Sequence, residues 1–249
     1  MTLVLGLGLF SGTQGGATAP AFDPASLFSS GEDGYIYDVQ ADGAVFEERT
    51  SPTTPPDDGD DFGTLLDLSG NGNHAVAPSD GARPRYEIDA NGPRCNYAFT
   101  LGSRLVATFD LNQPTTIVGA FVNPSAFVTG VLVDGLSSFS CALVGDSNVP
   151  SFFAGGSVIS ASAVTANEGF VITVRSSGAT SRIARNAEAY ATGNAGSQNA
   201  GGVSLGATTS GTNGGSASLY RVIGIGRDLT DAEITSARQW CAEAAGITL

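Results

Sequence analysis

His74 is the first residue to consider for chemistry, because it is the single histidine of the 249-residue chain. A Ser-His-Asp or Cys-His enzyme would have to use this residue, and a zinc site built from several histidines is excluded. His74 ends the segment 67–74, which reads DLSGNGNH. Gly and Asn adopt left-handed backbone at low cost, so this segment predicts a tight turn. We expect its His and Asn side chains to bond neighbouring backbone rather than to catalyse a reaction.

A second group of candidate ligands is the acidic loop that contains Asp57, Asp58, Asp60 and Asp61. Hard cations such as calcium bind several oxygen ligands at once. The loop lacks the ligand spacing and the closing Glu of an EF-hand. Prolines and a glycine around it are typical of an exposed turn. We therefore expect a solvated loop, with calcium binding as the alternative.

A third candidate is the polar, glycine-rich segment 190–202, which contains Tyr190, Asn194, Gln198 and Asn199. A glycan site needs an aromatic surface beside a few well-placed polar groups. These four residues are therefore the predicted glycan-binding set. The alternative is a connecting loop that binds nothing.

The charge balance excludes two classes of partner. Eleven Arg and no Lys stand against 24 Asp and Glu, which gives a net charge of −13. Nucleic-acid binding and binding to anionic membrane surfaces both need clusters of basic side chains, so we expect neither. The sequence also lacks an apolar stretch long enough to span a bilayer, so we expect no membrane insertion.

The three cysteines Cys95, Cys141 and Cys241 are odd in number, far apart and not arranged as C-x-x-C. We expect three buried, reduced thiols. One disulfide with one free thiol is the alternative.

The N-terminus alternates leucine and glycine, with Leu3, Leu5, Leu7, Leu9 and Phe10 as its apolar residues. A signal peptide would carry a basic segment, but no Lys or Arg precedes Arg49, so we expect an extended arm instead. An apolar arm outside a core must be buried against a neighbour. Residues 1–20 are therefore predicted to anchor the chain in an assembly.

The remainder, residues 21–249, reads as one β domain that opens with a segment and acidic loop over 21–62. Short apolar and β-branched runs separated by Gly, Ser and Asn predict strands at 104–111, 115–122, 127–133, 139–144, 158–161, 170–175, 181–184, 203–205 and 218–225. No helix-length crossover separates them, so the strands should pair antiparallel. This pattern predicts an all-β protein with two packed sheets.

One helix is predicted over residues 229–246. Thr230 and Glu233 have the spacing of a capping box, and Gly246 is placed to end the helix. The apolar face consists of Ile234, Ala237, Trp240, Cys241 and Ala244. We expect this face to pack on the sandwich with Trp240 as its main anchor.

Several segments together resemble a known group of proteins. These are 65–75 (LLDLSGNGNHA), 22–28 (FDPASLF), 31–38 (GEDGYIYD) and the closing strand and helix over 219–240. They are similar to tailed-bacteriophage virion proteins with a concanavalin A-like, laminin-G-like domain. The resemblance implies a jelly-roll sandwich of two antiparallel sheets with an extended N-terminal arm and one short C-terminal helix.

The resemblance also implies site properties. Laminin-G-like domains often hold calcium at a loop edge, which makes Asp110 and Asp134 the candidate metal ligands and calcium the candidate cofactor. Jelly rolls of this type include glycoside hydrolases with an E-x-D-x-E strand. The sequence has no such strand, and Glu168 and Glu188 fall in turns or at loop edges. We therefore expect a protein that is not an enzyme.

The expected function is that of a phage structural protein in a tail fibre or tail tip, which recognises a host-surface glycan. Its expected partners are other virion proteins and further copies of itself, as a trimer formed through the arm. It would be made in the host cytoplasm and reside on the tail or capsid surface of the virion. A capsid decoration or cement protein is the alternative function, and a secreted carbohydrate-active enzyme is a third hypothesis.

Overall fold

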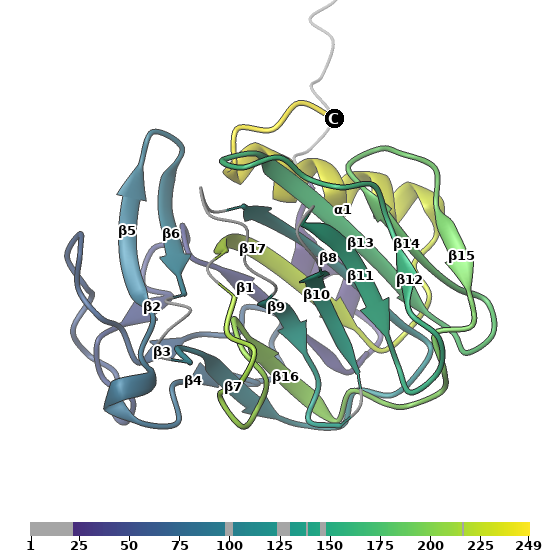
Figure 1. Ribbon diagram of the computed structural model, residues 1–249. Coiled ribbons are helices and arrows are strands. Elements are labelled where there is room, and N and C mark those ends of the chain that lie inside the picture. Colours follow the sequence, from purple (N-terminus) through teal and green to yellow (C-terminus); the bar gives the residue numbers. More distant parts are fainter. Residues whose placement is uncertain (1–21, 98–101, 124–129, 138, 145–147, 216) are drawn as a thin grey trace, which may run out of the picture.

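Two antiparallel sheets face each other in the computed structural model, which describes residues 22–97, 102–123, 130–137, 139–144, 148–215 and 217–249 (Figure 1). Sheet A contains, in spatial order, β15 (Ala191–Gly193), β14 (Ser181–Arg185), β13 (Gly169–Ser176), β8 (Thr115–Val122), β17 (Ser218–Ile225), β6 (Gly92–Asn96) and β5 (Arg85–Asp89). A further strand, β1 (Gly34–Asp38), pairs with β17.

Sheet B contains, in spatial order, β12 (Ile159–Ser160), β11 (Val149–Phe153), β10 (Ser140–Val144), β9 (Gly130–Asp134), β16 (Gly202–Leu205), β7 (Leu105–Thr108), β4 (Ala75–Val76), β3 (Thr64–Leu65) and β2 (Val45–Phe46). The helical elements are η1 (Pro24–Phe28), η2 (Asp80–Ala82) and α1 (Asp231–Ala244). The prediction of an all-β protein with two antiparallel sheets and one C-terminal helix is confirmed. The helices of the described residues are all too short or too polar to span a membrane.

The main core lies between the sheets, where aromatic rings pack in pairs. The ring centroids of Phe121 and Phe170 are 6.0 Å apart, and those of Phe139 and Phe152 are 5.0 Å apart. Phe121 and Phe170 lie on the paired strands β8 and β13 of sheet A. Phe152 lies on β11 of sheet B, and Phe139 directly precedes β10 of the same sheet. Each buried aromatic ring removes a large apolar area from water, so these pairs contribute strongly to the hydrophobic stabilisation of the sandwich.

A second core lies between sheet A and α1. On β8, Ile117 and Phe121 face the other sheet, whereas Val118 and Ala120 pack beneath the helix. This alternation follows from the two-residue period of a strand. Because both faces of β8 are covered, its whole sequence is apolar or β-branched except for Gly119.

The helix begins and ends as its sequence predicts. The Thr230 side chain accepts a hydrogen bond from the backbone of Glu233, and the Glu233 carboxylate accepts one in return from the Thr230 backbone. Hydrogen bonds from Arg227 lower the pKa of Glu233 to about 2. Gly246 has the left-handed φ of 64° expected of a helix stop.

The helix face is confirmed except for Trp240. Ile234, Ala237, Cys241 and Ala244 are buried, but Trp240 is only partly buried. Small residues bring the helix close to the sheet, so a side chain as large as Trp240 is displaced to the margin of the contact. Its expected role as the main anchor is therefore wrong.

The turn at residues 67–74 is confirmed, and Asp67 is its centre. The Asp67 carboxylate accepts hydrogen bonds from the backbone amides of Ile36, Ser69 and Asn73, at 2.9 to 3.0 Å. His74 Nδ1 accepts from the Asp67 backbone amide at 3.0 Å, so His74 serves the turn. The prediction of three reduced, buried thiols is also confirmed.

Candidate functional site

A groove of about 610 Å³ follows the exposed side of α1 and contains aromatic side chains. Its helical residues recur at intervals of three and four, so they share one face. We call this surface the aromatic groove, and it is lined by Phe22, Arg221, Thr235, Ser236, Gln239, Trp240 and Glu243.

Arg221 fixes the position of the tryptophan ring in this groove. Its guanidinium carbon lies 4.5 Å from the centroid of the Trp240 ring, and its Nη1 donates to the Trp240 carbonyl at 2.8 Å. Its Nε lies 2.9 Å from the carboxylate of Asp38, which is buried at the facing position of β1. A cation held in this way over an indole ring is stabilised by the ring quadrupole.

Polar groups complete the groove. Gln239 donates to the Glu243 carboxylate at 3.3 Å, one helical turn further along. Ser236 and Thr235 add hydroxyl groups to the same lining. The groove thus offers aromatic surface together with both donors and acceptors, which is the composition expected of a small-molecule site.

A second concave surface lies where η2 and the hairpin of β5 and β6 meet the loop after β2. Two adjoining cavities of about 430 Å³ and 500 Å³ share Asp80 and Arg83 in their linings. We call them together the arginine cleft, and the linings also include Glu47, Glu48, Arg49, Thr50, Asp61, Gly81, Arg85, Glu87, Asn96 and Ser103.

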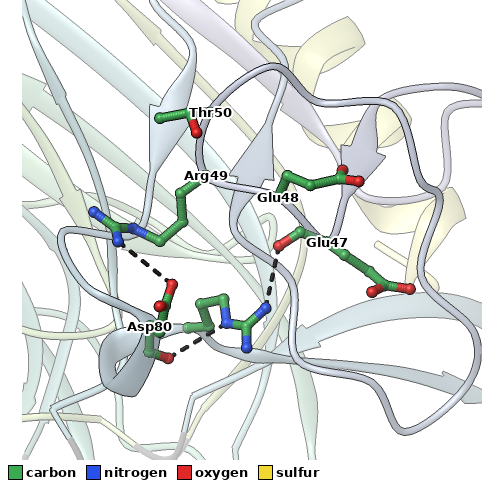
Figure 2. A pocket seen from close by; sticks show the side chains of 6 residues that line it. Glu47, Glu48, Arg49, Thr50 and Asp80 are labelled. Atoms are coloured by element: carbon green, nitrogen blue, oxygen red, sulfur yellow. Dashed lines mark hydrogen bonds and ion pairs between the residues drawn. The ribbon is translucent and has the colours of Figure 1, made fainter.

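Ion pairs hold most of the charged groups of this cleft. Figure 2 shows the Arg49 guanidinium directed at Asp80, at a distance of 3.4 Å. The Glu87 carboxylate accepts from Asn96 at 2.7 Å and from Arg94 at 2.9 Å. Asp61 and Arg85 form a looser pair at 3.9 Å.

The predicted glycan-binding residues are only partly brought together. Tyr190 lies beside α1, where the Arg238 guanidinium carbon is 5.1 Å from its ring centroid. Asn194, Gln198 and Asn199 lie beyond β15, in a loop that Gln113 fastens through backbone and side-chain bonds at 2.8 to 3.2 Å. Asn199 uses its amide oxygen for this contact. Their role in glycan binding stays a prediction.

The two predicted calcium ligands are separated. Asp110 is exposed after the end of β7, whereas Asp134 is buried at the end of β9, with β16 between these strands. Within the described ranges, no three His, Cys, Asp or Glu side chains are close enough to hold a metal ion together. Asp58 and Asp60 of the acidic loop accept hydrogen bonds from the backbone amides of Ile88 and Asp57.

Asp134 nevertheless has an unusual environment. Burial raises its pKa to about 7, although hydrogen bonds from Ser140 and from the backbone of Thr209 and Gly135 act in the opposite direction. Thr209 belongs to the loop 206–215, whose Asn213 carbonyl also accepts from the Val131 amide at 3.0 Å. Asp134 therefore ties this loop to sheet B.

Sequence reasoning missed both concave surfaces. The sequence does indicate the aromatic groove, because Thr235, Gln239 and Glu243 recur every four residues and so share one helix face next to Trp240. The arginine cleft has no such pattern, since its residues come from five separate segments. The predicted arm residues Leu3, Leu5, Leu7, Leu9 and Phe10 lie outside the described residues.

No family model matches the chain, and no curated protein matches its sequence. Solved structures share its fold. The sialidase of Trypanosoma rangeli in complex with sialic acid is 13% identical, with a TM-score of 0.56 over 88% of this chain and 34% of that chain. An arabinofuranosidase complexed with arabinofuranosyl-α-1,2-xylobiose is 13% identical, with a TM-score of 0.53 over 90% and 65%.

Domain 4 of AbnA, an extracellular arabinanase of Geobacillus stearothermophilus in complex with arabinotriose, is 11% identical, with a TM-score of 0.53 over 70% of this chain and 92% of that domain. The chain thus spans about a third of the sialidase and nearly all of the arabinanase domain. These similarities establish the sandwich fold, and none of these three structures is a phage protein.

The comparisons correct one expectation. We expected a protein that is not an enzyme because no E-x-D-x-E strand is present. Solved structures with this fold include sialidases, arabinofuranosidases and an arabinanase, which are glycoside hydrolases. The absence of one strand motif was therefore too narrow a basis for excluding catalysis, because one fold can carry different sites.

Proposed function

We propose that the chain recognises carbohydrate and that the aromatic groove is its binding site. The observation that carries this proposal is the placement of Trp240 and Phe22 beside Gln239, Glu243 and Arg221 in one groove of about 610 Å³. A sugar ring has apolar C–H faces and a rim of hydroxyl groups. Aromatic rings suit the faces, and paired donors and acceptors suit the rim.

The geometry favours a preformed site. Arg221 is held by Asp38 and by the Trp240 carbonyl, and Gln239 is held by Glu243. Side chains that are already ordered lose less conformational entropy when a ligand binds. The solved structures with this fold, which include an arabinanase domain in complex with arabinotriose, support a carbohydrate as the ligand class.

We also propose that this recognition serves a tailed-phage virion, in which the chain is a tail fibre or tail tip component at the host surface. The sequence resemblance supports this role, and capsid decoration is the competing role. The two differ in copy number, with a few trimers per tail against many copies per head. Quantitative mass spectrometry of purified particles distinguishes them.

The fluorescence of Trp240 tests the binding site directly, because the chain has a single tryptophan. A glycan array that includes arabino-oligosaccharides and sialylated glycans would select ligands for the full chain. Titration with a selected glycan should then change the Trp240 emission. We expect Trp240→Ala, followed by calorimetry, to weaken binding about tenfold.

The control variant is Gln198→Ala, in the loop predicted from sequence to bind glycans. Its affinity should equal that of the wild type, since Gln198 lies outside the groove. Binding that is lost in Gln198→Ala and kept in Trp240→Ala would overturn the assignment of the site. Release of reducing sugar from the same glycan would show that recognition is coupled to hydrolysis.

A further inference from the structure

Arg83 differs from the neighbouring arginines, because its guanidinium bonds to backbone carbonyls and not to a carboxylate. Arg49 pairs with Asp80, Arg85 with Asp61 and Arg94 with Glu87. In the described part of the chain, no carboxylate lies within ion-pair distance of Arg83.

The Arg83 guanidinium is instead positioned by backbone. Its Nε donates to the Asp80 carbonyl at 3.4 Å, and its Nη1 donates to the Glu47 carbonyl at 3.3 Å. These bonds are long, and they leave the charge without a counterion. A guanidinium presents a planar fork that matches a carboxylate through two parallel hydrogen bonds.

The charges near Arg83 favour a single negative charge. In Figure 2 the carboxylates of Glu47 and Glu48 extend away from the Arg49 guanidinium, and the Glu48 carboxylate accepts from Thr53 and Thr54. Arg49, Arg83 and Asp80 alone sum to one positive charge, whereas the whole lining, with three arginines against five carboxylates, carries a net charge of −2. Because the whole chain carries −13, a dianion would meet more repulsion than a monoanion.

The adjoining cavity of about 500 Å³ supplies groups for hydroxyls. The Asn96 side-chain amide donates to the Glu87 carboxylate at 2.7 Å, and both residues line this cavity with Arg83. A ligand whose carboxylate meets Arg83 would place its remaining polar groups against an amide and a carboxylate. A sugar ring bears hydroxyls that can donate to Glu87 and accept from Asn96.

We propose that the arginine cleft is a second binding site and that its ligand is a uronate, a sugar that carries one carboxylate group. The carboxylate occupies the place of the missing counterion at Arg83. The ring hydroxyls lie along Glu87 and Asn96. This site is separate from the aromatic groove and does not depend on the function proposed for it.

Calorimetry on the full chain with D-glucuronate and D-glucose tests the proposal, because these sugars differ only at the carboxylate carbon. We expect glucuronate to bind at least about tenfold more tightly than glucose. Arg83→Gln should remove this preference, and added salt should weaken it. Phosphate and acetate, as separate titrants, should bind more weakly than glucuronate.

Arg182→Gln is the matched control, because Arg182 is exposed on β14, forms no ion pair among the described residues and changes the net charge equally. This variant should keep the preference for glucuronate. Thermal unfolding confirms that each variant is folded. Equal binding of the two sugars, no binding of glucuronate, tighter binding of phosphate, or equal effects of Arg83→Gln and Arg182→Gln would each overturn the proposal.

Discussion

The guanidinium carbon of Arg221 lies 4.5 Å from the centroid of the Trp240 ring, while its Nε contacts the buried carboxylate of Asp38 at 2.9 Å. One side chain thus connects the strand pair β1 and β17 to the exposed groove on α1. Removal of one partner from a buried pair leaves an uncompensated charge. The stability of the sheet and the shape of the groove are therefore coupled through Arg221.

We expect Arg221→Gln to lower the free energy of unfolding by about 2–4 kcal/mol, because it leaves Asp38 buried without its cation. Urea unfolding of the wild type, Arg221→Gln, Asp38→Asn and the double variant measures the coupling. The double variant should be more stable than the sum of the single effects predicts. Additive effects would show that the two side chains do not stabilise the fold as a pair.

The turn at 67–74 gives a second prediction. Asp67→Ala removes the acceptor for the amides of Ile36, Ser69 and Asn73, and two of these bonds lie within the turn. Hydrogen bonds to a charged acceptor contribute more than neutral ones, so we expect a loss of about 2–4 kcal/mol in urea unfolding. Ser69→Ala, which removes one hydroxyl that donates to Asp67 and accepts weakly from the Asn71 amide, should cost about 1 kcal/mol. A loss for Asp67→Ala no larger than that of Ser69→Ala would contradict this account.

Asp134 predicts an unusual dependence of stability on pH. Its pKa is raised from 3.8 to about 7 by burial, so the folded state binds a proton more tightly than the unfolded state. The stability contributed by the protonated form is complete below about pH 4 and is lost as the pH rises to about 7. Asp134→Asn keeps an acceptor oxygen for Ser140 and Thr209 without the charge.

This variant should therefore be more stable than the wild type near pH 8, by on the order of 2 kcal/mol, and similar to it near pH 4. Thermal unfolding across this range measures the difference. Asp110→Asn, which removes a carboxylate at an exposed position, serves as the control. A constant difference between Asp134→Asn and the wild type at all pH values would refute the role of the Asp134 charge.

The fold was predictable where local pattern and tertiary packing agree. The strands 115–122 and 218–225 were predicted with the bounds that the structure has, because both of their faces are largely buried and their sequences are mostly apolar or β-branched. Strands β5 and β6 were missed, since they contain Pro93, two arginines and mostly half-exposed side chains. Their pairing depends on a hairpin turn at Ala90 and Asn91 rather than on hydrophobic alternation.

The candidate sites were less predictable than the fold. Trp240 was expected to be an anchor because its helical position matches the apolar face, but the close approach of α1 to the sheet leaves it at the edge. Arg83 could not be identified from sequence, since its lack of a carboxylate partner depends on where Asp80, Glu47 and Glu87 lie in space. Pattern identifies which residues share one element, whereas a cleft between elements depends on tertiary packing.

Glu233 gives the opposite pH dependence to Asp134. Hydrogen bonds from Arg227 lower its pKa to about 2 from 4.5, so the ionised form stabilises the folded state. This contribution is present above about pH 4.5 and is lost as the pH falls toward about 2. Glu233→Gln keeps an acceptor for the Thr230 amide, because Gln also serves at this position of a capping box. It should therefore be less stable than the wild type at neutral pH, and the difference should shrink steadily as the pH approaches 2.

Helix unfolding followed by circular dichroism measures this trend, with Glu243→Gln as a control near the other end of α1. A difference that persists unchanged at low pH would mean that Glu233 acts through its shape and not through its charge.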